Sequence, residues 1–316
     1  MHIRRLFLTR DRRPALVWRV LAYALSFGVV LTLRGPLETW LDRRLGRIEI
    51  GLWRLAIAQV IVVSVAIALT LGVTWVFRRF VDRRAWEEMA MPPPWRRERG
   101  RDLALGFGLG MVMILAVFAV EFGLGWIRIV GVKEGFTGAT VLALLTARFV
   151  HFVGAAVCEE AAYRGYLLQN AGERFPLWIA VLATGAVFAS SHFPAGGFGI
   201  GFVAAGIIGS VLLAELRLVT KAIWMGVGWH LAWDWMQDGL GMVPGYSPLV
   251  VERSGPALWT GSGMAIEGGL LTIVVLTAGV AAVLWWSRAT GRAIDWRARL
   301  LADPRRSIPT ESDSRA

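Results

Sequence analysis

Cysteine and histidine are scarce in this chain of 316 residues, which contains one Cys and four His. The single cysteine, Cys158, excludes an internal disulfide framework, and no Cys/His finger spacing is present. The HExxH helix of many zinc metalloproteases is missing, and so is the GxSxG turn that presents a nucleophilic serine. The first residues are basic but lack the short apolar core and cleavage site of a signal peptide, so we expect a cytoplasmic N-terminal arm.

Long apolar runs, in contrast, are abundant, and hydrophobic residues make up 56% of the chain. A run of roughly 17–25 apolar residues is long enough to cross a bilayer as a helix. We predict eight spans: Ala15–Leu33, Leu55–Phe77, Leu103–Trp126, Val141–Leu168, Pro176–Ser191, Phe198–Ala214, Ala222–Trp235 and Ile266–Trp286. The predicted fold is an all-α polytopic membrane protein with about eight transmembrane helices and its site inside the helical bundle.

The net charge of +11 could indicate a nucleic-acid partner. The basic residues, however, gather in the gaps between apolar runs, and most of them fall on one side of the predicted membrane. This asymmetry is the positive-inside pattern of membrane proteins. We therefore expect a multi-pass protein of the cell membrane with both termini in the cytoplasm, surrounded by the lipid bilayer and without a nucleic-acid partner.

Three regions follow from this pattern. Residues 1–100 hold two predicted helices, a basic arm and a linker rich in Pro and Arg, and proline is a poor residue for a helix interior. Residues 101–290 hold the other six predicted spans, which we expect to form the functional core. Residues 291–316 form a polar cytoplasmic tail, which we expect to be disordered.

Two adjacent glutamates, Glu159 and Glu160, interrupt an apolar segment, and Arg164 follows four residues after the second. Charged residues inside a membrane are costly, so such a cluster is a candidate functional site. On a helix, Glu160 and Arg164 share a face and can form an ion pair. Glu159 points about 100° away from Glu160, which leaves it free to face a cavity. A buried charge cluster that only fixes helix packing is the alternative.

Two further polar groups lie in later apolar runs. His192 ends the predicted fifth span, after the sequence FASS, and a lone histidine at a helix end is often only an interfacial residue. His230 and Asp234 are four residues apart in the predicted seventh span, so they lie on one helix face and can form a hydrogen bond or bind a metal together. An internally satisfied polar pair is the structural alternative.

A site built from Glu159, His192, His230 and Asp234 contains a general base, a proton carrier and hydrogen-bond donors. Histidines can activate the same water as a carboxylate base or stabilise an oxyanion. These residue types indicate hydrolysis without a nucleophilic side chain.

The segments EEAAYRG, FASSH and HLAWD resemble the motifs EExxxR, FxxxH and HxxxN/D of the CPBP intramembrane proteases, the bacterial relatives of the type II CAAX prenyl endopeptidase. All three occur in that order and with the same internal spacing, and the resemblance covers about 103–286. It implies an intramembrane endopeptidase that acts on a peptide or membrane-protein substrate.

The resemblance also implies roles for the individual residues. Glu159 and His192 would activate the attacking water, His230 and Asp234 would bind the oxyanion or position the carbonyl, and Glu160 with Arg164 would shape the cavity as a catalytic-site ion pair. Asp234 stands where many relatives have Asn. An ionised Asp cannot donate a hydrogen bond, so it is protonated, orients His230 or binds a metal.

The cofactor question stays open at this point, because the family is described both as metalloproteases and as glutamate proteases without a metal. Two histidines and carboxylates could hold zinc with one open position, and the candidate ligands are Glu159, His192, His230 and Asp234. Two other functions would also use buried polar clusters: a non-catalytic membrane scaffold and a proton-coupled transporter.

Overall fold

The computed structural model describes residues 9, 13–45, 53–192, 199–243, 247–261 and 266–300. These residues are predominantly helical, which confirms the predicted all-α class. The longer helices are α2 (Leu16–Leu45), α3 (Arg54–Val76), α4 (Arg97–Gly123), α5 (Gly138–Glu159), α6 (Leu168–Arg174), α7 (Leu177–Ser191), α8 (Ile200–Thr220), α9 (Trp224–Gly239) and α11 (Leu270–Ala289). Short helical turns are η2 (Phe77–Val81), η3 (Trp86–Met89), η4 (Glu160–Leu167), α10 (Ala257–Thr260) and η6 (Ile266–Gly268).

Six helical segments of the described chain are long and apolar enough to cross a membrane. They are Leu16–Leu45, Arg54–Val81, Arg97–Gly123, Gly138–Arg174, Ile200–Thr220 and Leu270–Ala289. The chain is thus a multi-pass membrane protein. Helix α7 has 15 residues and α9 has 16, so both are shorter than a typical span. The predicted count of eight transmembrane helices is therefore not confirmed.

Helix α2 extends beyond its predicted end at Leu33, since it continues to Leu45 and contains Pro36. The sequence RGP indicates a stop, since proline removes one helical hydrogen bond and restricts the residue before it. The helix nevertheless continues, and α2 packs against α3. Arg34, which we expected in an outer loop, therefore lies within a helix.

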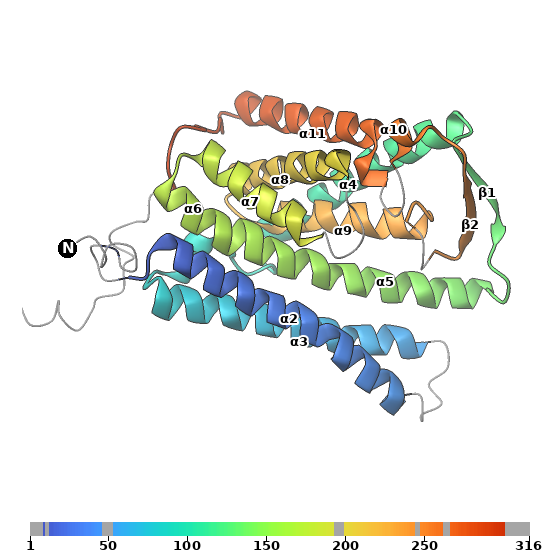
Figure 1. Cartoon of the computed structure of the whole chain (residues 1–316), viewed down its shortest axis with the longest axis horizontal. Coiled ribbons are helices and arrows are strands. Elements are labelled where there is room, and N and C mark those ends of the chain that lie inside the picture. The colour runs from blue at the N-terminus through green and yellow to red at the C-terminus, as the bar shows by residue number, and fades with distance from the viewer. Residues whose placement is uncertain are drawn as a thin grey trace, which may run out of the picture.

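A small β-ribbon is the exception to the helical architecture. Strands β1 (Ile127–Val132) and β2 (Leu249–Arg253) pair antiparallel, with Ile127 opposite Arg253 and an irregularity between Ile129 and Gly131. The ribbon joins the segment after α4 to the segment after α9. Figure 1 shows it at one end of the bundle, opposite the end where α2 begins and α11 finishes.

Glycines let α4 and α9 approach each other closely. A Cβ atom at Gly106 would lie 1.9 Å from the carbonyl oxygen of Met225, and one at Gly110 would lie 2.5 Å from that of Trp229. On the facing helix, a Cβ at Gly228 would lie 2.1 Å from the carbonyl oxygen of Leu103. Small residues at helix contacts of this kind allow backbone-to-backbone packing in membrane proteins. The contact fixes α9, the helix that carries His230.

Helix α9 begins inside the bundle, not at its edge. Its first turn follows the buried residues Ala222 and Ile223, and the amide of Ile223 donates to the carbonyl of Ala90, 2.9 Å away. The indole of Trp224 donates to the carbonyl of Pro92, at 2.7 Å. The Pro- and Arg-rich linker thus lies against the start of α9. Figure 1 shows α9 displaced along the bundle so that it starts near the end of α7.

The C-terminal segment contacts α6 and α7 as far as Leu300. The amides of Leu177 and Trp178, which begin α7, donate to the carbonyls of Ala298 and Trp296, at 2.9 and 3.1 Å. These bonds satisfy amides that have no partner within the helix. Residues 291–300 of the predicted disordered tail therefore lie against the bundle, whereas 301–316 lie outside the described residues.

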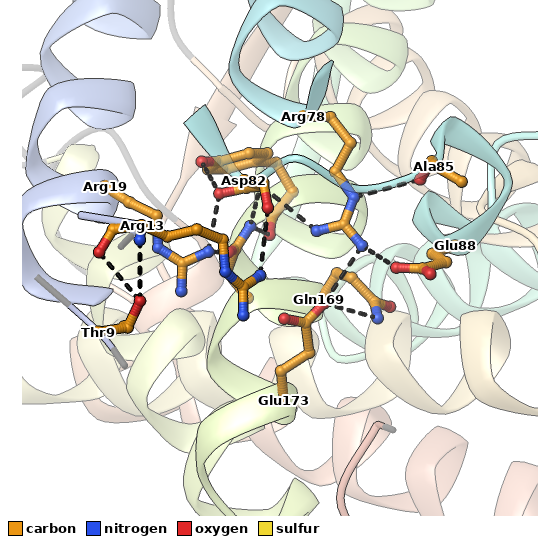
Figure 2. A network of polar contacts seen from close by, with 11 residues as sticks. Thr9, Arg13, Arg19, Arg78, Asp82, Ala85, Glu88, Gln169 and Glu173 are labelled. Carbon is orange, nitrogen blue, oxygen red and sulfur yellow. Dashed lines mark hydrogen bonds and ion pairs between the residues drawn. The ribbon is translucent and has the colours of Figure 1, made fainter. Parts of the chain in front are cut away.

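A buried polar network joins α2 and η2 to the core (Figure 2). Asp82 is fully buried and accepts hydrogen bonds from Arg19 at 2.8 Å, Asn170 at 3.1 Å, Tyr166 at 3.2 Å and Arg78 at 3.3 Å. Arg78 also pairs with Glu88 and with Glu173. Tyr23 of α2 stacks on Tyr166, with ring centroids 3.9 Å apart. The two N-terminal helices are thus bound to η4 and α6 through buried charges, not only through apolar contacts.

Candidate functional site

The two adjacent glutamates lie where α5 changes into a π-helix. Glu159 is the last residue of α5, and Glu160 begins η4, which is fully buried from Glu160 to Leu167. We expected a continuous α-helix here, because the apolar pattern does not distinguish the two forms over eight residues. Isolated π-helical turns inside α-helices occur frequently at functional sites. The wider turn places the first motif in the centre of the bundle.

Glu160 is the centre of a buried charge cluster. Its Oε1 accepts from Nη1 of Arg164 at 2.8 Å and from Nδ1 of His230 at 3.1 Å. The other guanidinium nitrogen of Arg164 donates to Oγ of Ser210 on α8, at 2.9 Å, and the guanidinium lies 4.5 Å from the ring centre of Phe188. The expected Glu160–Arg164 ion pair is therefore present, and it connects η4, α8 and α9.

His230 lies between three carboxylates. Its Nδ1 faces Glu160, whereas Nε2 lies 3.4 Å from Oδ2 of Asp234 and 3.8 Å from Oε2 of Glu159. Ionised carboxylates only accept hydrogen bonds. A ring with carboxylates at both nitrogens is therefore best satisfied as the doubly protonated imidazolium, which places a positive charge beside Glu159.

His192 follows the last residue of α7. Its Nδ1 lies 3.0 Å from the carbonyl oxygen of Phe188. A carbonyl can only accept, so Nδ1 carries the proton, and a neutral ring then has Nε2 as its acceptor. The Phe188 ring lies between the two histidines, with centroids 4.8 Å from His192 and 6.1 Å from His230. The ring of Phe188 thus separates His192 from His230, and the backbone carbonyl of Phe188 orients His192.

One cavity of about 510 Å³ brings the predicted residues together. Its walls include Glu159, His192, His230 and Asp234, which come from α5, the end of α7 and α9. The side chains of Glu159 and Asp234 are 18% and 24% exposed, whereas that of Glu160 is 1% exposed. The neighbouring glutamates therefore face differently, as the helical spacing predicts: Glu159 lines the cavity, and Glu160 is in the interior.

Several charged residues of the cavity were not anticipated from the sequence. Arg148 of α5 binds Asp238 of α9 with both Nε and Nη2, at 2.9 and 3.2 Å. Glu267 in η6 accepts from the indole of Trp233 at 3.3 Å. Burial raises the pKa of the Glu267 carboxyl, and the charge of Asp234 adds to the effect. Glu267 is the only ionisable residue at the start of the last apolar run, which is the signal that could have identified it.

The candidate zinc ligands do not have the arrangement of a metal centre. Within the described part of the chain, no group of three or more His, Cys, Asp or Glu side chains is placed to hold a metal ion. Both nitrogens of His230 already face carboxylates. In this arrangement Glu159, His192, His230 and Asp234 do not fit the zinc site that the sequence left open, and the chemistry below is derived from side chains alone.

Comparison with known proteins agrees with the motifs. Residues 138–236 match the family model described as Rce1-like, type II CAAX prenyl endopeptidase. The match runs from the start of α5 into α9 and contains all three motifs. No curated protein matches the chain significantly. Residues 138–236, about a third of the chain, are thus similar to the Rce1-like type II CAAX prenyl endopeptidases.

Proposed function

We propose that this protein is an intramembrane endopeptidase in which Glu159 and His192 activate a water molecule for attack on a peptide bond. The observation that carries the proposal is the convergence of Glu159, His192, His230 and Asp234 on one cavity within a bundle of apolar helices. Three polar motifs that served only helix packing would have no reason to share a cavity wall.

Glu159 is the candidate general base. Its side chain is partly exposed to the cavity, and its Oε2 has no hydrogen-bond partner among the described residues. An ionised carboxylate with free acceptor capacity can take a proton from water. His192, with Nε2 as its acceptor, would hold the same water from the opposite wall. The water oxygen then bonds to the carbonyl carbon, and its proton passes to Glu159.

His230 is the candidate oxyanion stabiliser. Its Nδ1 bonds to Glu160, whereas Nε2 lies 3.4 Å from Asp234 and 3.8 Å from Glu159, both longer than an ordinary hydrogen bond. The Nε2–H would therefore donate to the negatively charged oxygen that forms on the substrate carbonyl. Preorganised donors of this kind contribute about 10²–10³-fold to the rate. Asp234 and Glu160 keep the His230 ring charged and oriented. This role suits an aspartate at position 234, because an ionised Asp cannot itself donate a hydrogen bond to the oxyanion. Collapse of the intermediate breaks the C–N bond, and the proton on Glu159 passes to the leaving amine.

The test uses the full chain reconstituted in liposomes with a pool of membrane-protein substrates, and new peptide termini are mapped by mass spectrometry. We expect cleavage by the wild type and loss of at least about 10²-fold of the rate in His192→Ala and His230→Gln variants. Glu134→Gln, at an exposed residue outside the cavity, serves as the matched control. Absence of new termini, together with proton flux under a pH gradient, would instead favour the transporter.

A further inference from the structure

A second cavity adjoins the site on the side of α2. It has a volume of about 370 Å³ and is lined by residues of α2, α5, η4 and the end of α7. Four residues line both this cavity and the one described above: Arg34, His151, Glu159 and His192. The base and the water-binding histidine therefore have α2 as a neighbouring wall, although α2 lies outside the matched segment 138–236.

Arg34 is the cationic residue of that wall. Its Nη2 lies 3.2 Å from Nδ1 of His151, and the amide oxygen Oε1 of Gln59 from α3 also lies 3.2 Å from that nitrogen. Arginine can only donate, so this His151 nitrogen is an acceptor and the ring is neutral. The contact orients the guanidinium without neutralising its charge.

The other arginines of the site have carboxylate partners. Arg164 pairs with Glu160, and Arg148 pairs with Asp238. Across the part of the chain that the structure describes, no carboxylate lies within ion-pair distance of Arg34. Glu38, one turn later on α2, lines the second cavity but instead faces Gln59, at 3.5 Å.

An arginine without a carboxylate partner is expensive inside a membrane, and such residues usually face a cavity and mark a substrate pathway. We propose that Arg34, held by His151, forms a subsite for a carboxylate of the peptide substrate, beside the bond to be cleaved. The inference rests on the proposed function, since it assigns part of the substrate of the same site.

The chemistry of the subsite selects the ligand class. A guanidinium can bind a carboxylate through two parallel hydrogen bonds, which fixes position as well as charge. The carboxylate has two possible sources in a peptide: the side chain of Asp or Glu, or a free C-terminus. Because Arg34 shares cavity walls with Glu159 and His192, either source must lie close to the scissile bond along the substrate.

Binding tests the subsite independently of catalysis. Full-length Glu159→Gln protein is immobilised in detergent and exposed to apolar peptide pools in three forms: a free C-terminal carboxylate, a C-terminal amide, and an amide with a single Glu. Retained peptides are quantified by mass spectrometry. We expect at least one carboxylate-bearing form to be retained about tenfold or more over the neutral amide, and the form that is retained identifies the source.

The variant series separates charge from fold. Arg34→Gln should abolish the preference for carboxylates, Arg34→Lys should keep part of it, and Arg44→Gln, at an exposed arginine of the same helix, should leave it unchanged. Equal retention of neutral and carboxylate pools by the parent protein would overturn the inference. An unchanged preference in a stably folded Arg34→Gln protein would overturn it too. Cleavage of the same pools by the wild-type chain tests the proposed function separately.

Discussion

Replacing Asp82 with Ala should strongly destabilise the protein, because it removes the shared acceptor of a buried network. The carboxylate is fully buried and accepts from Arg19, Arg78, Tyr166 and Asn170. Arg78 keeps Glu88 and Glu173 as ion-pair partners in the variant, whereas Arg19 keeps only the neutral side chain of Asn170. The loss is therefore concentrated on one uncompensated buried guanidinium.

The expected magnitude follows from this geometry. Breaking a buried ion pair by removing one partner costs about 3–5 kcal/mol of the free energy of unfolding. For a chain of 316 residues, that corresponds to a fall of about 5–8 °C in Tm. Thermal unfolding in detergent, followed by the fluorescence of the 16 tryptophans, measures it. Asp42→Asn is the control, because its ion pair with Arg54 is largely exposed and should contribute little.

A second substitution tests whether the uncompensated charge of Arg19 causes the loss of stability. Arg19→Met combined with Asp82→Ala removes the stranded charge and should recover part of the lost stability. We also expect the single variant to expose residues 82–96 to limited proteolysis, since Asp82 joins α2 and η2 to η4 and α6. A Tm within 2 °C of wild type would refute the reasoning and leave residues 1–100 as a separable unit.

Two further predictions concern the position and the charge of the site. Gly228→Val should separate α4 from α9 and reduce both stability and any cleavage activity, because even a Cβ at this position would lie 2.1 Å from the carbonyl oxygen of Leu103. Gly108→Val is the control, since a Cβ there meets nothing within 4 Å. Equal Tm values for the two variants would contradict the packing argument. The pKa of Glu267 is raised by burial, so its contribution to stability is fully present below the ordinary glutamate pKa near 4 and is lost as the pH rises through the raised value. As the pH is raised from acid to alkaline, the Tm of the Glu267→Gln protein should therefore fall less than that of the wild type. Parallel curves of Tm against pH for the two proteins would contradict this prediction.

Hydropathy and motif spacing predict much of the architecture. The apolar runs identify the long helices because their side chains must face lipid or one another. The four-residue spacing of Glu160 and Arg164 is sufficient to anticipate their ion pair, observed at 2.8 Å. The same spacing places His230 and Asp234 on one face of α9, where the two side chains lie 3.4 Å apart.

Features that depend on tertiary contacts could not be predicted from these patterns. The depth of α9 is set by a linker more than 100 residues earlier in the chain, through the bond between Ile223 and Ala90. His192 and His230 therefore share a cavity wall, although their distances from the predicted span starts differ by eight residues. The local sequence around Arg34 indicates a helix stop, so its place beside His151 is likewise visible only in the structure.

The most direct test of the central claim is the cleavage rate of the Glu159→Gln protein in liposomes, measured on a peptide that the wild type cleaves. Glutamine preserves the shape of the side chain but cannot accept the proton of the attacking water. We expect the rate to fall by about 10²–10⁴-fold, with peptide binding and Tm close to those of the wild type. Cleavage at an undiminished rate would contradict the assignment of Glu159 as the base.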